Sequence, residues 1–174
     1  MNRHPLIFAS ACSLFLLTCT SAYAQTEAAK CEKVLPLNTL NAEAGAGFKA
    51  EFAYDRDPGG IECGWVRLEP GGDKTQIIVL HRNKAAIASQ AKNYQKGRTP
   101  DEMWEVDVHD TERSQDSLRQ IIPGLGKRAA LVPLPKLRLA ARAFVLREND
   151  SIMMTATGLS NGDFIKVAKV IAAP

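Results

Sequence analysis

The chain has 174 residues, of which 45% are hydrophobic, and its formal net charge is +3. This composition supplies an ordinary hydrophobic core. So small a charge gives no reason to expect a nucleic-acid-binding protein, which would need a strongly basic surface.

The first 24 residues have the order of a secretory signal peptide. Arg3 precedes an apolar run from Leu6 to Leu17, and Ser21-Ala22-Tyr23-Ala24 supplies the small residues of a cleavage site. We expect cleavage after Ala24, which leaves a single domain over 25–174. This mature domain has 21 basic and 19 acidic residues, and we expect it to be periplasmic or secreted. The apolar run is too short to span a bilayer and no later stretch is long enough, so no transmembrane segment is predicted.

The segment Leu16-Leu17-Thr18-Cys19 offers an alternative, because it resembles a bacterial lipobox. Cys19 would then carry a lipid anchor and hold the protein at a membrane. Under the main interpretation Cys12 and Cys19 leave with the signal peptide. The remaining pair, Cys31 and Cys63, predicts a disulfide in an oxidising compartment, and two cysteines are too few for a structural zinc site.

Hydrophobic periodicity gives the expected elements of the mature chain. A helix is expected over about 36–45, then strands over 48–54, 61–68 and 75–81, of which the last has a continuous apolar run. A second helix follows over about 84–96. The segment 97–117 is the least regular, since 100–102 could start a helical turn while Trp104, Val106 and Val108 alternate like a short strand. Strands over 127–132, 137–147 and 151–157 precede a final helix capped by Ser160 or Asn161.

Strands grouped before helices favour an α+β fold over a parallel α/β fold. We expect a curved antiparallel sheet with helices on one side. The order of three strands and a helix occurs twice, which is compatible with two βββα units, although no residue-level repeat is present.

Several short patterns occur in a characteristic order: Cys31 followed by Leu35, Leu37 and Leu40; Cys63-Gly64-Trp65; Gly124-Leu125-Gly126 before Ala129-Ala130; and a final Ala-rich helix ending at Ala173. This order resembles a family of exported bacterial lipoproteins of unknown function that is common in actinobacteria. The resemblance covers almost all of the mature chain. It departs from the family at Lys127, where an aspartate is usual. It implies an α+β domain on a curved antiparallel sheet, and it brings no catalytic residues.

No motif in the sequence predicts a catalytic centre, a cofactor or a metal site. A Gly-x-Ser-x-Gly motif is absent, and the turn glycines open no helix after a strand, so a phosphate loop is not expected. Two weaker patterns remain. Asp107, His109 and Asp110 could hold a divalent cation with one more ligand, although a polar loop is favoured. Acidic residues of 101–110 could serve a hydrolase, and the candidates are Asp101, Glu102, Glu105 and Asp107.

Charge patterning is the most informative remaining feature. Seven acidic residues and one arginine lie within 101–116, whereas six basic and no acidic residues lie within 127–147. The favoured interpretation is that the two segments neutralise each other. The alternative is a basic strip in which Arg138 and Arg142 share one strand face and meet an acidic partner. Trp104, which stands among acidic residues, is a further candidate for an exposed binding residue.

The sequence therefore favours an exported, non-enzymatic domain that binds a protein or an anionic envelope component. The weak candidates for partner contact are Arg138, Arg142 and Trp104. Two alternatives stay open, an envelope hydrolase that uses the acidic residues of 101–110 and a secreted enzyme inhibitor.

Overall fold

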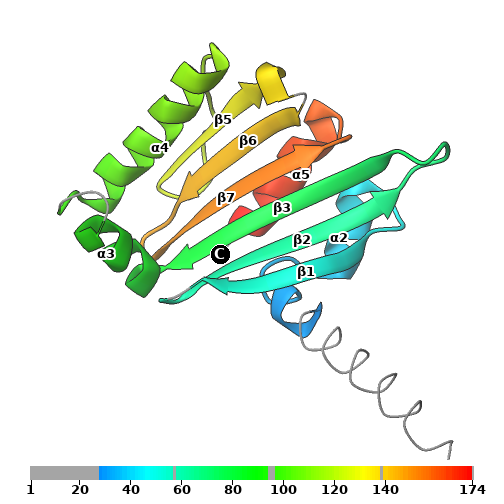
Figure 1. Cartoon of the computed structure of the whole chain (residues 1–174), viewed down its shortest axis with the longest axis horizontal. Coiled ribbons are helices and arrows are strands. Elements are labelled where there is room, and N and C mark those ends of the chain that lie inside the picture. Colours follow the sequence, from blue (N-terminus) through cyan, green and yellow to red (C-terminus); the bar gives the residue numbers. More distant parts are fainter. Residues whose placement is uncertain (1–27, 57, 94–96, 138, 174) are drawn as a thin grey trace, which may run out of the picture.

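The computed structural model describes residues 28–56, 58–93, 97–137 and 139–173 (Figure 1). The predicted signal peptide, its cleavage site and Cys19 lie outside these residues. The elements follow in this order: α2 (Leu37–Ala44), β1 (Lys49–Arg56), β2 (Gly60–Leu68), β3 (Lys74–Asn83), α3 (Lys84–Asn93), α4 (Pro100–Gln115), β4 (Gln120–Ile121), β5 (Arg128–Leu134), the 3-10 turn η1 (Pro135–Leu137), β6 (Leu139–Leu146), β7 (Asp150–Thr157) and α5 (Asn161–Ala172).

Within the described residues, seven strands form one antiparallel sheet in the order β1-β2-β3-β7-β6-β5-β4. Each half of the sheet is a meander, and the two halves meet where β3 pairs with β7. The predicted α+β class with an antiparallel sheet is confirmed. Among the described helices, none is long and apolar enough to cross a membrane.

One face of the sheet, here called the disulfide face, carries the main core. Trp65, Val79 and Met154 are almost fully buried on it, and α2 and α5 pack against it. Helix α5 presents its apolar stripe at the spacing expected for an amphipathic helix, through Phe164, Val167, Ala168 and Ile171. In Figure 1 both helices lie behind the sheet.

The predicted disulfide forms on this face. Cys31 and Cys63 are bonded with their Cα atoms 5.6 Å apart, and both are buried. The bond ties the helical residues 28–31 to the middle of β2. Gly64 and Trp65 follow directly in the same strand, and the predicted strand over 61–68 contributes Cys63 and Trp65 to the main core.

The expectation of helices on one side is wrong for α4, which packs on the opposite face over β5 and β6. Its residues Trp104 and Val108 form a second, smaller core with Ala130, Val132 and Phe144. The two halves of the chain are not equivalent βββα units, because α5 packs against the disulfide face whereas α3, the helix of the first half, reaches only the margin of the sheet at β3 and β7.

The predicted short strand at 104–108 is also wrong, because these residues belong to α4. A capping box starts the helix: Thr99 Oγ1 accepts from the Glu102 N–H at 3.3 Å, and Glu102 Oε2 accepts from the Thr99 N–H at 2.7 Å. Pro100 is the first helical residue, where its missing N–H costs nothing. Asp116 ends the helix in a left-handed conformation at φ 50°.

Replacing Thr99 by alanine is expected to lower the free energy of unfolding by about 1 kcal/mol, because the end of α4 loses its capping hydroxyl. Urea unfolding followed by circular dichroism measures this change. Thr99→Ser keeps the hydroxyl and is expected to retain the stability of the unmodified protein. Equal losses in the two variants would show that the cap contributes nothing.

Candidate partner-binding face

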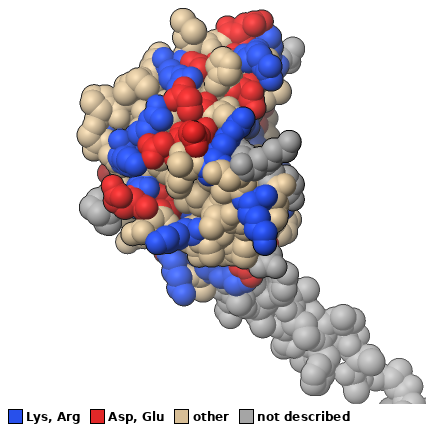
Figure 2. Space-filling model, turned by 90° about the vertical axis from the view of Figure 1, so that its left-hand side faces the viewer, with Lys and Arg blue, Asp and Glu red and all other residues tan. Residues whose placement is uncertain are grey.

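The acidic segment on α4 and the basic segment after it pair with each other. Asp101 binds Lys127, Glu105 binds Arg128 and Asp116 binds Lys136, each at 2.6 Å. Figure 2, which shows the side of α3 and α4, has acidic and basic side chains interspersed and not separated into patches. Mutual neutralisation, the interpretation favoured from the sequence, accounts for these six residues.

Arg119 joins the same network from the chain that follows α4. Its guanidinium donates to Glu105 at 2.5 Å and to Glu112 at 2.6 Å. The hydrogen bond from Arg119 holds the pKa of Glu112 below its usual value, against the opposing effect of burial. Burial also raises the pKa of Glu105, but the bonds from Arg119 and Arg128 more than offset it.

Acid is therefore expected to destabilise the packing of α4. A carboxylate whose folded pKa is depressed contributes stability above its unfolded pKa, and this contribution is lost as the pH falls below about 4. Glu112→Gln is expected to be less stable near neutral pH and to lose less stability on acidification than the unmodified protein. Urea unfolding across acidic pH measures both effects. Glu148→Gln, which changes an exposed carboxylate, serves as the control, and an acid profile unchanged by Glu112→Gln would contradict the assignment.

The acidic residues proposed for a hydrolase each have a structural partner. Asp101 and Glu105 bind basic residues of the following segment, Glu102 caps α4, and Asp107 binds Arg82 at 3.3 Å. Among the described residues, no three His, Cys, Asp or Glu side chains lie close enough to hold a metal ion, and this includes the group around His109. The geometry gives no support to hydrolysis through this segment.

The structure places two of the three residues predicted to contact a partner, Trp104 and Arg142, in different environments. Trp104 is only 5% exposed and lies beneath Arg128, whose guanidinium carbon is 4.2 Å from the indole centroid, so the expected exposure is wrong. Arg138 lies outside the described residues. Arg142 is half-buried on β6, and its Nε donates to Thr155 Oγ1 at 3.1 Å.

Arg142 stands out because no carboxylate pairs with it among the described residues. Burial lowers the pKa of its guanidinium, and the nearby Asp107 carboxylate only partly offsets this. A half-buried cation without an ion-pair partner is costly to maintain.

Arg142 borders a part of the sheet that no described helix covers. We call this part the open face: the side of β1, β2, β3 and β7 opposite the disulfide face. Helices α3 and α4 reach only its margins, at β7 and at one end of β3. In Figure 1 these strands face the viewer with no helix in front of them. The apolar side chains on this face are Phe52, Tyr54, Val66, Leu68, Ile78, Leu80 and Met153.

The centre of the open face is apolar although it is uncovered. Phe52, Val66, Ile78 and Leu80 are half-buried and belong to neither core, while Tyr54 is 54% exposed. Antiparallel sheets that show one face to water usually carry polar side chains there. This face is mixed instead, because its apolar side chains share register rows with Glu62, Gln76 and Thr155, and its apolar share is typical of a surface that binds another molecule.

Two stacked aromatic side chains lie on the open face at the edge strand β1. The rings of Phe52 and Tyr54 stack with centroids 5.0 Å apart. The ring of Phe52 lies over Gly64 so closely that a Cβ at Gly64 would be 2.2 Å from it. The glycine of the Cys-Gly-Trp strand therefore gives Phe52 its place on the open face.

Cations outnumber carboxylates around the apolar centre. Lys49, Lys74 and Arg142 have no ion-pair partner among the described residues. The other charged side chains of this face are already engaged, in the contacts Arg56–Glu62, Arg82–Asp107 and Glu51–Gln76. The open face therefore combines an apolar centre with two unpaired lysines, and the unpaired Arg142 borders it.

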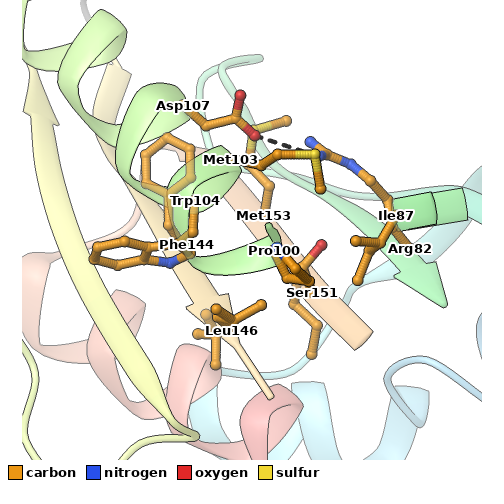
Figure 3. Close-up of a pocket in the computed structure, with 12 residues that line it drawn as sticks. Arg82, Ile87, Pro100, Met103, Trp104, Asp107, Phe144, Leu146, Ser151 and Met153 are labelled. Atoms are coloured by element: carbon orange, nitrogen blue, oxygen red, sulfur yellow. Dashed lines mark hydrogen bonds and ion pairs between the residues drawn. The ribbon is translucent and has the colours of Figure 1, made fainter. Parts of the chain in front are cut away.

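The open face is hollowed near both ends of its strands. Val66, Leu68 and Lys74 line one hollow, and Leu80, Arg82 and Gln90 line the other. At its margin a cavity of about 20 Å³ lies between α4 and the sheet, with room for about one water molecule. Figure 3 shows Arg82 and Asp107 paired at the rim of this cavity, with Trp104 and Phe144 on its other side.

A second polar cluster, not predicted from the sequence, lies at the end of β3 and β7. Asp150 accepts from Arg147 and lies 3.0 Å from His81 Nε2. Burial raises the pKa of Asp150, but the bonds from Arg147 and His81 bring it below its usual value. Because the three residues join neighbouring strands and the hairpin between β6 and β7, we interpret the cluster as structural.

Comparisons of the chain with protein-family models, with curated proteins and with solved structures give no match. The resemblance to exported lipoproteins therefore stays a prediction, and the assignment of a function rests on the open face.

Proposed function

We propose that this protein is an exported, non-enzymatic domain that binds a protein or an anionic component of the cell envelope through the open face. The observation that carries the proposal is the uncovered apolar centre, formed by Phe52, Val66, Ile78 and Leu80. These side chains are half-buried by their strand neighbours, and Tyr54 and Leu68 beside them are exposed. Apolar side chains that gather on an uncovered face mark interaction sites.

The chemistry of this face favours a protein over a glycan. Val66, Ile78 and Leu80 have aliphatic side chains, which offer no hydrogen bonds to sugar hydroxyls and gain free energy by burying apolar groups. The flanking cations Lys49, Lys74 and Arg142 favour a partner with acidic groups. An acidic protein partner satisfies both features, and an anionic polymer satisfies only the second.

Affinity capture from the native envelope tests the proposal. The bait is the full chain, expressed with its own leader and tagged at the C-terminus. Ile78→Ser/Leu80→Ser removes the aliphatic centre, and Ile121→Ser is the matched control because Ile121 is 62% exposed on β4. We expect a specific partner that is lost with the double variant and kept with the control, while thermal unfolding shows that both variants are folded. Capture unchanged by the double substitution would overturn the proposal.

Export is a separate part of the proposal and has its own test. The sequence predicts a mature protein that begins at Gln25, with lipidation of Cys19 as the alternative. Mass spectrometry of the intact protein recovered from cells distinguishes a free Gln25 terminus from an acylated Cys19. An unprocessed chain in the cytoplasm would overturn export.

A further inference from the structure

We propose that the occupant of the open face is an acidic amphipathic helix of a partner protein. This inference rests on the proposed function, since it names the element that the open face binds. It follows from the dimensions of the uncovered surface, from the arrangement of helices on the rest of the sheet, and from the unpaired cations.

The uncovered surface has about the length and width of one helix, and α3 bounds it at one end of β3. Strand β3 has ten residues, so it is about 33 Å long at about 3.3 Å per residue. A helix of about 20 residues is about 30 Å long. Strands β1, β2, β3 and β7 span about 14 Å between the outer axes at about 4.8 Å per step. A helix with its side chains is about 10 Å wide, which leaves room for one beside α4.

The rest of the sheet is already covered by helices. Helices α2 and α5 pack on the disulfide face, and α4 packs over β5 and β6 on the same side as the open face. A partner helix over β1–β3 would complete the second layer, with α4 as its neighbour. Leu80 and Met153 lie in one register row and would contact the apolar stripe of such a helix.

Arg142 lies at one flank of the proposed helix, and the two lysines lie near one of its ends. Arg142 lies in the same register row as Ile78 and Thr155, on the side of α4. In the sheet, Lys49 lies opposite Val66 and Lys74 lies opposite Leu68. Both lysines therefore lie at the same end of the strands, where β2 finishes. An apolar stripe whose neighbouring carboxylates reach both Arg142 on one side and the two lysines at one end complements this arrangement. A second copy of this chain would bring the same unpaired cations toward each other, which disfavours self-association through this face.

Synthetic peptides test the inference against the full chain, purified as the cell processes it. The first probe is a 20-residue helical peptide with a leucine stripe flanked by glutamates. The second has lysine in place of every glutamate, and the third has the composition of the first in scrambled order. Fluorescence anisotropy measures their binding at low and at moderate salt.

We expect the acidic helix to bind at least about tenfold more tightly than either matched peptide, and to weaken as salt screens the cations. Arg142→Ala and Lys74→Glu are each expected to weaken it severalfold. Ile78→Ser/Leu80→Ser is expected to abolish binding, and Ile121→Ser to leave it unchanged. Lys74 is exposed, so Lys74→Glu tests the charge even if Arg142→Ala disturbs the sheet.

Each of the following outcomes would overturn the inference. Equal binding of the scrambled peptide would show non-specific charge attraction, and equal binding of the lysine peptide would show that the cations play no part. A dimer in sedimentation that Ile78→Ser/Leu80→Ser dissociates would identify a second copy as the occupant. If no peptide binds but envelope capture still depends on Ile78 and Leu80, the helix is wrong and the proposed function stands. Capture that is independent of both residues would remove the proposed function itself.

Discussion

Replacing Cys31 and Cys63 by alanine is expected to lower the free energy of unfolding by about 3–4 kcal/mol. The disulfide closes a loop over a sequence separation of 32 residues, which contains α2 and β1. Without the bond the unfolded chain regains the entropy of that loop. Alanine is preferred to serine because both positions are buried and a hydroxyl there would need a partner.

Urea unfolding of the oxidised protein, the reduced protein and the double variant measures the effect. Reduction is expected to destabilise the unmodified protein to about the level of the variant and to leave the variant itself unchanged. A thiol titration of unfolded, unreduced protein that finds two free thiols would contradict the bond. Equal stability before and after reduction would contradict its contribution.

The strands of the sheet, except the two-residue β4, could be predicted from the sequence because alternation is a local signal. Cys63 and Trp65 share a face by the period of two, and both lie in the main core as that period requires. The three-strand order in each half and the disulfide also follow from local pattern and cysteine count. Side-by-side placement of β3 and β7 does not, since it depends on contacts far apart in the sequence.

Helix α4 shows how a local signal can mislead. Trp104, Val106 and Val108 alternate over five residues, which favours a strand. Trp104, Val108 and Thr111 also recur at helical spacing, and the capping box at Thr99 and Glu102 decides for the helix. The Thr-Pro-Asp-Glu sequence is a start signal that is readable from the chain alone.

The open face could not be predicted for a different reason. Ile77 and Val79 face the core, while Ile78 and Leu80 face the uncovered side of the same strand. A continuous apolar run is typical of a strand buried on both faces, and nothing local distinguishes the two sets. Which face the helices cover is fixed by the packing of α2, α4 and α5, so the open face is visible only in the assembled fold.

Replacing Trp104 by alanine is expected to lower the free energy of unfolding by about 3–5 kcal/mol, the usual cost of removing a buried aromatic side chain. The indole fills the second core between α4 and the sheet, against Ala130, Val132 and Phe144. Loss of the ring also removes the surface on which Arg128 stacks. No part of this cost requires Trp104 to contact a partner.

Trp104→Phe separates packing from hydrogen bonding. The indole Nε1 is buried with no hydrogen-bond partner among the described residues, so its removal leaves no group unsatisfied. We expect phenylalanine to cost less than about 1.5 kcal/mol, from the smaller ring and the weaker stacking of Arg128. Urea unfolding measures both variants, and capture from the envelope is expected to be unchanged by Trp104→Phe. A stable Trp104→Phe protein that no longer binds its partner would show that Trp104 takes part in binding. A large loss of stability in this variant would show that Nε1 has a hydrogen-bond partner in solution.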